Sequence, residues 1–344
     1  MVNESKVNVG IVGASGYSGE ELLRLLLRHP YCNISFITSR QYEGKALSDV
    51  FPKFNSTLKF QSPDLKNLID NNIKYVFMAL PHGVAAESAE IILEKGAVII
   101  DISADFRLRS AELYKQYYGL EHPFPDLLKQ AVYSLPELRR EDIKNASLIA
   151  CPGCYPTSIL LALIPLLNKK LIYEKNIIVS SGSGVSGAGR KAEIPYIFPE
   201  CNESFRAYSP TGHRHISEIE QELRIASGNE NLVINFIPHL VPMNRGINST
   251  IIVDYIGDAI EHVAEAYSKY YKNEQFIRIL SNGKMADTKN VNMTNLCEIG
   301  HVYDKRTGKL IITSAIDNLT KGAAGQAVQC FNISCGFDEK TALI

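Results

Sequence analysis

A cysteine near the middle of the chain lies at a corner rich in proline and glycine, Cys151-Pro152-Gly153-Cys154-Tyr155-Pro156. The apolar run 148–150 before the corner is typical of a strand end, and the run 159–167 after it is typical of a buried helix. Cys154 is therefore expected just before or inside the first turn of a helix, where free N–H groups and the helix dipole stabilise a thiolate over a thiol. We expect Cys154 to be a nucleophile at neutral pH.

The same cysteine has other interpretations. Cys151 and Cys154 form a C-x-x-C pair, which occurs in redox proteins and in zinc sites. A zinc site needs further ligands, and the other cysteines form no second pair of this spacing, so we expect no metal. A thioredoxin-like pair or a buried structural cysteine remain alternatives. Thr157 or Ser158 is expected to cap the following helix.

Histidines and cations elsewhere in the chain could act together with such a thiol. His213, His215 and His239 are candidate general acids. If residues 211–215 are extended, His213 and His215 share a face, and alternation cannot choose between them. The stretch 181–191 combines glycines and serines with two cations after an apolar run, which favours a cradle for an oxyanion or phosphate. Arginines on expected loops are candidate anion ligands: Arg107, Arg190 and Arg245.

The amino-terminal stretch reads as strand, glycine turn and helix. The run Val7–Val12 leads into Gly13-Ala14-Ser15-Gly16-Tyr17-Ser18-Gly19, and a helix is expected over 20–27. In this arrangement a pyrophosphate approaches the backbone at the glycines and sits on the helix N-terminus. The spacing is G-x-x-G-x-x-G and not the usual G-x-G-x-x-G, so the prediction depends on the strand and helix on either side.

The end of the next predicted strand, 32–38, indicates which dinucleotide binds. An NAD site usually has an acid there, on the ribose 2′-hydroxyl. This chain has Thr38-Ser39-Arg40, and a serine and an arginine would bind a 2′-phosphate by charge-assisted hydrogen bonds. We therefore expect NADP(H).

Further apolar runs at 74–80, 97–102 and 148–150 are predicted strands, with a helix over 84–95. Alternating strands and helices predict an α/β fold with a doubly wound, Rossmann-type parallel sheet. Ligands of such sheets lie beyond the carboxyl ends of the strands, which include Pro81 and the segment before Arg107. Residues 108–147 are expected to be a loop-rich connection.

The second half predicts a different architecture. Expected strands are 177–180, 232–237, 247–255 and 276–280; expected helices are one opened by a Ser217–Glu220 capping box, 258–271 and 318–331. Such an order favours an α+β domain with a mixed, mostly antiparallel sheet. We expect a dinucleotide-binding domain over 1–150, joined by the C-terminal helix at about 317–344, and a catalytic and oligomerisation domain over 151–316.

Composition limits the number of domains, the classes of partner and the compartment that we expect. The chain has 344 residues and a formal net charge of −1, which favours two domains and gives no sign of a nucleic-acid or membrane partner. Its seven scattered cysteines lack a disulfide framework, as is typical of a reducing cytoplasm. We expect no signal peptide, and no apolar run is long enough to span a bilayer.

Together these motifs resemble the N-acetyl-γ-glutamyl-phosphate reductases, relatives of the aspartate-semialdehyde dehydrogenases, over essentially the whole chain. The resemblance rests on the glycine turn, the cysteine corner and segments at 38–40, 101–107, 184–190, 212–215, 238–246 and 317–326. The cysteine motif and Pro242-Met243-Asn244-Arg245-Gly246 are the specific ones. Cys151 stands where this family often has Asn, which leaves Cys154 as the nucleophile.

The resemblance implies that the Cys154 thiolate attacks N-acetyl-γ-glutamyl phosphate, phosphate leaves, and NADPH reduces the thioacyl enzyme to a semialdehyde. The family's spacing favours His213 as the acid, and the family forms dimers or tetramers. Implied cofactor contacts are Gly13, Ser15, Gly16, Tyr17, Ser18, Gly19, Ser39, Arg40, Pro81, Ser183, Gly184, Gly187 and Asn318. Implied substrate contacts are Arg107, Ser186, Arg190, His215 and Arg245.

Three other functions stay open at this point. The chain could act on aspartyl phosphate, as an aspartate-semialdehyde dehydrogenase does. It could be an NADP-binding regulator without catalysis, or a thiol–disulfide oxidoreductase using Cys151 and Cys154. The last alternative predicts that Cys151→Ser abolishes activity, whereas the reductase predicts little change.

Overall fold

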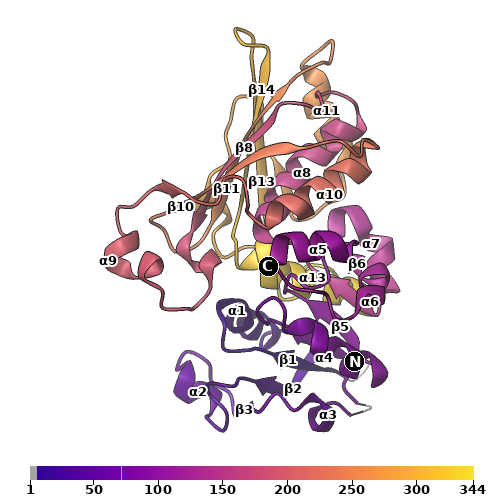
Figure 1. The fold of residues 1–344 in the computed structure, drawn as a ribbon, viewed down its shortest axis with the longest axis vertical. Coiled ribbons are helices and arrows are strands. Elements are labelled where there is room, and N and C mark those ends of the chain that lie inside the picture. The colour runs from indigo at the N-terminus through magenta and orange to yellow at the C-terminus, as the bar shows by residue number, and fades with distance from the viewer. Residues whose placement is uncertain (1–5, 71) are drawn as a thin grey trace. The chain divides into compact units, whose positions relative to one another are not determined.

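The protein is described by a computed structural model that covers residues 6–70 and 72–344. One compact unit holds the chain up to Pro152 together with Ala323–Ile344, and a second holds Gly153–Gly322. Within the described residues each unit is built on a seven-stranded sheet (Figure 1). No helix in these described ranges is long and apolar enough to cross a membrane.

The sheet of the first unit has parallel pairing at every recorded pair, in the order β3-β2-β1-β4-β5-β7-β6. Chain order reverses beside β1, which lies between β2 and β4, so the carboxyl ends of β1 and β4 form the switch point where ligands of doubly wound sheets bind. This confirms the predicted Rossmann-type topology. The strands are β1 (Val7–Val12), β2 (Cys32–Thr38), β3 (Phe60–Gln61), β4 (Tyr75–Met78), β5 (Val98–Asp101), β6 (Val132–Tyr133) and β7 (Leu148–Ala150).

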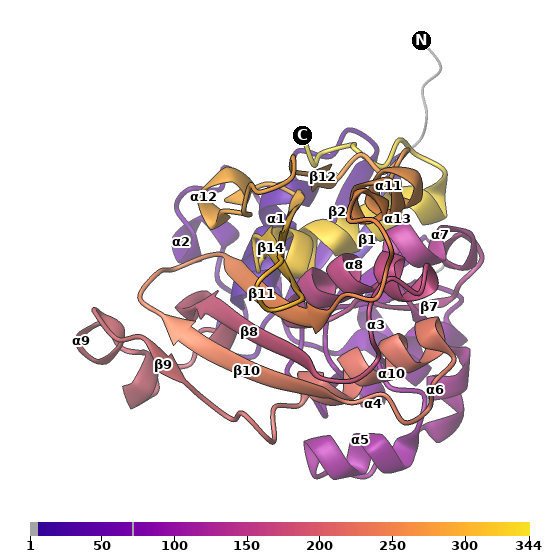
Figure 2. The ribbon, with the colours of Figure 1, turned by 90° about the horizontal axis from the view of Figure 1, so that it is seen from above.

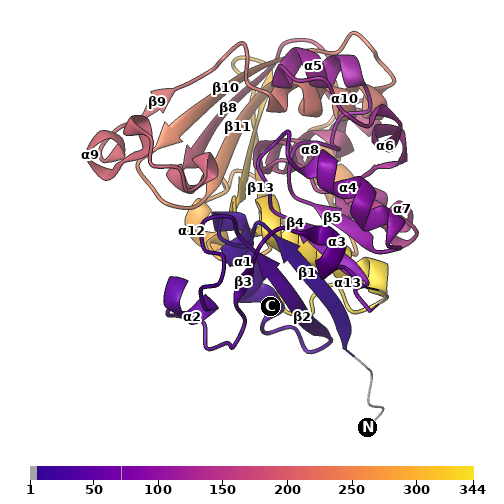
Figure 3. The ribbon, with the colours of Figure 1, turned by 60° about the horizontal axis from the view of Figure 1, so that its bottom comes forward.

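The helices of this unit include one from the end of the chain. Figure 3 shows β1, β2, β4 and β5 in one sheet with α13 beside it, and α13 packs against α1, α7 and β5. Its residues 325–333 are buried throughout. The helices are α1 (Tyr17–Leu26), α2 (Leu47–Val50), α3 (Leu65–Leu68), α4 (Ala85–Glu94), α5 (Ala111–Tyr118), α6 (Pro125–Gln130), α7 (Pro136–Lys144) and α13 (Gly325–Cys335).

The expectation of a loop-rich connection over 108–147 is wrong, because α5, α6, β6 and α7 occupy it. Ser110 caps α5 by accepting a hydrogen bond from Leu113 N, and prolines open the other two helices. These helices are only six to nine residues long, which is too short for a helical periodicity to be detected in the sequence.

The second unit has a mixed sheet in the order β12-β13-β14-β11-β8-β10-β9. Antiparallel pairs join β11 to β8 and β14, β13 to β14, and β10 to β9, whereas β8–β10 and β12–β13 are parallel. This confirms a mixed, mostly antiparallel sheet. Figure 2 shows β8, β10 and β11 running side by side. The strands are β8 (Ile177–Gly184), β9 (Arg206–Ala207), β10 (Ile234–Val241), β11 (Ile247–Asp254), β12 (Ile277–Ile279), β13 (Cys297–Asp304) and β14 (Lys309–Ile316).

One long helix, α8 (Cys154–Asn168), is the core element of this unit. Its residues from Tyr155 to Leu167 are all buried, and it packs against α10, α11, β11 and β14. A helix that is apolar on all sides must be covered on all sides, as this one is. The other elements are η1 (Val185–Ala188), η2 (Ile194–Tyr196), α9 (Phe198–Cys201), α10 (His215–Ser227), α11 (Glu261–Tyr270), α12 (Thr288–Val291) and the π-helical turn η3 (Thr320–Ala324).

Candidate active site

The glycine turn of the first unit is compact. Gly13 has φ +82°, and a Cβ there would lie 2.5 Å from Ala79 O; a Cβ on Gly19 would lie 2.5 Å from Gly13 O. The helix α1 begins at Tyr17 and not at residue 20, with Gly16 as its N-cap, so Ser18 and Gly19 belong to its first turn. Glycine is thus required by close backbone approach, which is the geometry of a pyrophosphate-binding turn.

The end of β2 is bonded to this turn. Thr38 Oγ1 accepts from Gly13 N at 3.2 Å, and the hydroxyls of Ser15 and Ser39 lie 2.9 Å apart. Arg40 follows directly and is exposed, as is Pro81 after β4. The turn, the partly exposed helix start and a cation at the strand end fit a dinucleotide with a 2′-phosphate.

Arg107 is buried beneath the carboxyl ends of these strands. Its Nε donates to Cys151 O and its Nη2 to Ile102 O, both at 2.8 Å. The carboxylate of Asp105 accepts hydrogen bonds from backbone N–H groups at the start of α4 and from Tyr114 Oη at 2.9 Å. Burial, with the nearby charge of Asp105, raises the pKa of Asp101 to about 7.

Cys154 is the first residue of α8, and Gly153 is the N-cap. The expectation that Thr157 or Ser158 caps the helix is wrong, because their hydroxyls donate backward to Gly153 O and Tyr155 O, each at 3.0 Å. The buried carboxylate of Glu218 instead accepts from Gly153 N at 2.7 Å. Cys154 is partly exposed at this helix start.

A cluster of aromatic rings and histidines surrounds the start of α8. Tyr155 and Tyr208 share a hydrogen bond of 3.1 Å between their hydroxyls, and the His213 ring centroid lies 5.5 and 5.6 Å from theirs. Burial, with a smaller contribution from the charge of Cys154, raises the pKa of Tyr208 to about 12. No sequence motif indicated Tyr208, whereas Tyr155 lies next to the cysteine in the chain.

His213 is neutral in this environment. Burial, together with the adjacent Arg214 cation, lowers its pKa to about 4. Its Nδ1 accepts a hydrogen bond from His215 N at 3.1 Å, so the neutral ring carries its proton on Nε2. His239 lies on β10, where its ring stacks on Phe205 at 4.9 Å.

The segment around His213 is not extended, and the predicted capping box is wrong. The helix α10 begins at His215, so Ser217 lies inside it and donates to Arg214 O at 2.7 Å. Glu220 accepts from Ile234 N and pairs with Arg224. The N-cap is Arg214, whose side chain makes no capping bond, and the ring of His213 accepts from the N–H of His215, the first residue of the helix.

The glycine–serine stretch is partly strand. β8 continues to Gly184, four residues beyond the expected end, because β10 and β11 pair with it there. Ser183 is buried and donates to Gly184 O, Ser186 lies in η1 and donates to Asn244 O, and Gly187 and Arg190 are exposed.

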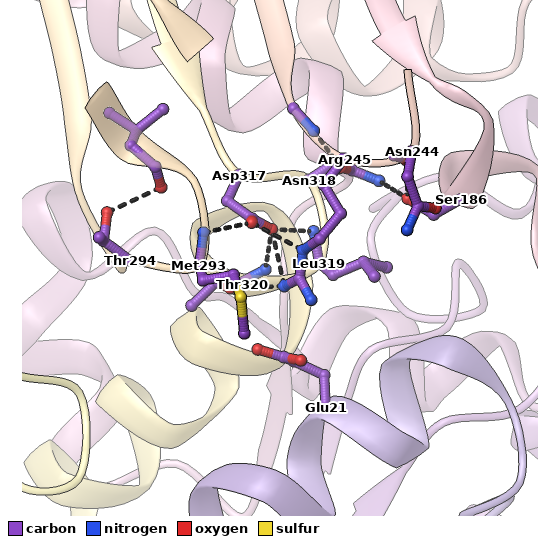
Figure 4. Close-up of polar contacts among 12 residues, drawn as sticks. Glu21, Ser186, Asn244, Arg245, Met293, Thr294, Asp317, Asn318, Leu319 and Thr320 are labelled. Atoms are coloured by element: carbon purple, nitrogen blue, oxygen red, sulfur yellow. Dashed lines mark hydrogen bonds and ion pairs between the residues drawn. The ribbon is translucent and has the colours of Figure 1, made fainter. Parts of the chain in front are cut away.

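The remaining predicted ligands, Arg245 and Asn318, have partners within the unit. Figure 4 shows the Arg245 guanidinium on the Asp317 carboxylate, at 2.8 and 3.0 Å. Asn318 Nδ2 donates to Ser186 Oγ at 2.9 Å, and its Oδ1 accepts from Gly246 N at 2.7 Å. These bonds tie the end of β14 to the turn between β10 and β11. No cluster of three or more metal-ligating side chains occurs among the described residues.

Two family models match the chain. Residues 8–146 match the NAD binding domain of semialdehyde dehydrogenases, and residues 154–318 match their dimerisation domain. Solved structures share the fold at low sequence identity. An aspartate semialdehyde dehydrogenase II from Vibrio cholerae, complexed with ASA, has a TM-score of 0.73 and 20% identity, with 96% of this chain and 99% of that chain covered. A relative from Candida albicans, solved with NADP, has a TM-score of 0.70 and 16% identity, with 96% and 98% covered.

Curated relatives are much more similar in sequence. The N-acetyl-gamma-glutamyl-phosphate reductase of Akkermansia muciniphila is 51% identical, over 98% of this chain and 99% of its own length. That of Acetivibrio thermocellus is 47% identical, over 98% and 97%. The chain belongs to the N-acetyl-gamma-glutamyl-phosphate reductase family.

Proposed function

We propose that the protein reduces N-acetyl-γ-glutamyl phosphate to N-acetylglutamate 5-semialdehyde, releasing inorganic phosphate, in arginine biosynthesis. The observation that carries this proposal is the position of Cys154 at the first residue of α8, beside Tyr155, Tyr208 and a neutral His213. We infer the substrate from the family, and we infer the nucleophile and a nearby hydrogen-bond donor from the site.

The first step is acyl transfer to sulfur. The helix N-terminus favours the Cys154 thiolate, which attacks the acyl carbon of the substrate. The carbon–oxygen bond to phosphate breaks, and phosphate leaves with the electron pair. The product is a thioester on Cys154, which accepts a hydride more readily than a carboxylate does.

The second step forms an oxyanion, and we propose that His213 stabilises it. A ring with its proton on Nε2 and a pKa of about 4 is a poor base but a good neutral donor. We assign to His213 a hydrogen bond to the tetrahedral oxyanion. The oxyanion then collapses, the carbon–sulfur bond breaks, and the semialdehyde is released with the Cys154 thiolate restored.

NADPH, when bound, supplies the hydride for this reduction. The residues that would hold it are the compact turn of Gly13–Gly19, whose backbone N–H groups would bind the pyrophosphate, and Ser39 and Arg40 at the end of β2. Further contacts with NADPH stay predicted for four residues of the second unit: Ser183, Gly184, Gly187 and Asn318.

Among the arginines, Arg190 is the one we assign to the substrate's anionic groups, because it is exposed on the glycine-rich segment. Arg107 and Arg245 direct their guanidinium groups to carbonyl and carboxylate partners within their own units. We further propose that the protein is a homo-oligomer, a dimer or tetramer, in line with the matched dimerisation domain and the exposed apolar residues Ile194, Phe198 and Phe205.

The test is phosphate-dependent oxidation in the reverse direction. N-acetylglutamate semialdehyde, NADP and phosphate are mixed with wild-type, Cys154→Ser and Cys151→Ser proteins, and absorbance of the reduced nicotinamide is followed. We expect activity in wild type and Cys151→Ser, and its loss in Cys154→Ser. Activity with aspartate semialdehyde and none with N-acetylglutamate semialdehyde would overturn the substrate assignment. Activity in Cys154→Ser would overturn the mechanism.

A further inference from the structure

The end of β14 carries a buried carboxylate that the proposed mechanism leaves unused. Asp317 is fully buried. Its Oδ2 accepts from Arg245 Nε at 2.8 Å and from Met293 N at 2.7 Å. Its Oδ1 accepts from Arg245 Nη2 at 3.0 Å and from Leu319 N and Thr320 N, each at 2.9 Å (Figure 4). A carboxylate with this many donors has its lone pairs satisfied and is held in one orientation.

The same residue shapes the backbone that follows. Asp317 O accepts from Gly322 N at 2.9 Å, a bond between residues five apart that belongs to the π-helical turn Thr320–Ala324. Arg245 Nη2 also donates to Thr320 Oγ1 at 3.0 Å, at the first residue of that turn. Single π-helical turns are uncommon and occur frequently at functional sites. The Asp317–Arg245 pair therefore fixes the entry to an unusual turn.

This turn lies against the candidate nucleophile. A Cβ added to Gly322 would lie 2.8 Å from Cys154 Cβ and 3.2 Å from Cys154 Cα, closer than side chains approach. Close contact alone requires glycine here, because Gly322 is not among the glycines with positive φ. The position of the turn thus sets a limit on the position of Cys154.

We propose that the Asp317–Arg245 ion pair positions Cys154, by holding the π-helical turn whose Gly322 packs against the cysteine. The inference rests on the proposed function, in which Cys154 is the nucleophile. It gives Arg245 a positioning role in place of the substrate contact that the sequence predicts. A misplaced sulfur loses both its alignment with the acyl carbon and its place at the helix N-terminus.

Two variants test this role. Gly322→Ala pushes directly on Cys154, and Arg245→Lys keeps the charge but loses the bidentate contact and the bond to Thr320. The matched control is Arg224→Lys, which weakens another arginine–carboxylate pair of the same unit, that with Glu220 at 2.9 Å. Each variant is assayed for kcat and KM. Alkylation of Cys154 by iodoacetamide at pH 7 is measured without substrate by peptide mass spectrometry, with partly exposed Cys201 as the internal reference.

We expect Gly322→Ala to lower kcat by about 100-fold, the effect of roughly 1 Å of misplacement, with KM within about twofold of wild type. Cys154 alkylation should slow by about two- to fivefold as the sulfur leaves the helix N-terminus, while Cys201 is unaffected. Arg245→Lys should lower kcat and the rate of Cys154 alkylation by smaller factors, and Arg224→Lys should change neither of them.

A folded Gly322→Ala protein with wild-type kcat and alkylation would overturn the inference. So would an Arg245→Lys protein with raised KM and unchanged alkylation, because Arg245 would then bind substrate. If Gly322→Ala does not fold, the kcat, KM and alkylation rate of Arg245→Lys decide whether the inference holds. Alkylation needs no turnover, so failure of the proposed function, seen as activity in Cys154→Ser, is distinguishable from failure of this inference.

Discussion

His213 makes the stability of the protein depend on pH in a way that can be calculated. Its pKa falls from 6.5 to about 4 on folding, because burial disfavours the charged ring and Arg214 repels it. Between these values the unfolded chain binds a proton that the folded protein does not, so unfolding becomes easier as pH falls from 6.5 towards 4. For these two pKa values, the loss between pH 7 and pH 4.5 is about 2.4 kcal/mol.

The substitution His213→Gln removes this contribution. The free energy of unfolding is measured by urea denaturation at pH 7 and pH 4.5, at one protein concentration, for wild type, His213→Gln and His262→Gln. His262 lies on α11 with an exposed ring and is the control. The loss in free energy of unfolding between pH 7 and pH 4.5 should be about 2.4 kcal/mol smaller in His213→Gln than in wild type. The same loss should equal that of wild type in His262→Gln. An unchanged difference in His213→Gln would refute a neutral His213, and with it the assigned hydrogen bond to the oxyanion.

Two further predictions concern single side chains. Arg40→Glu should raise the KM for NADPH about 10- to 100-fold relative to that for NADH, the effect of lost charge-assisted hydrogen bonds to the 2′-phosphate; an unchanged ratio of the two KM values would contradict the cofactor assignment. Glu218→Ala leaves the buried Gly153 N–H without this acceptor and should lower the free energy of unfolding by about 1–3 kcal/mol in urea titrations; a wild-type urea midpoint would show that another group replaces the carboxylate.

Elements with long, regular apolar patterns were predictable from the sequence. Both β1 and β2 have the predicted bounds, and the fold class follows from their alternation with helices. The hairpin of β13 and β14 was missed, because polar and charged residues interrupt its apolar positions. β10 was predicted to stop before Pro238; proline is tolerated there because the neighbouring strand β9 is short and pairs with His239 and Leu240.

The site was predictable where a motif is contiguous and not where its parts come together in space. Cys154 and the glycine turn follow from short stretches with a physical signature. The hydrogen bond from Gly153 to Glu218 joins residues far apart in the chain, and nothing in the local sequence distinguishes this glutamate from a surface residue of α10. For Arg245 the residue type led to a prediction that it binds an anion of the substrate. The structure instead shows it paired with Asp317, which lies far from it in the sequence.

The C-terminal helix has a consequence for how the protein is made. Because α13 belongs to the first unit and packs on α1, α7 and β5, that unit is assembled from both ends of the chain. During synthesis its amino-terminal part emerges early, yet the apolar surface that α13 covers stays open until residues 325–335 have emerged from the ribosome. The second unit is contiguous and can complete its core first. Nascent chains stalled near residue 322 should therefore engage chaperones through the face of α1 and α7.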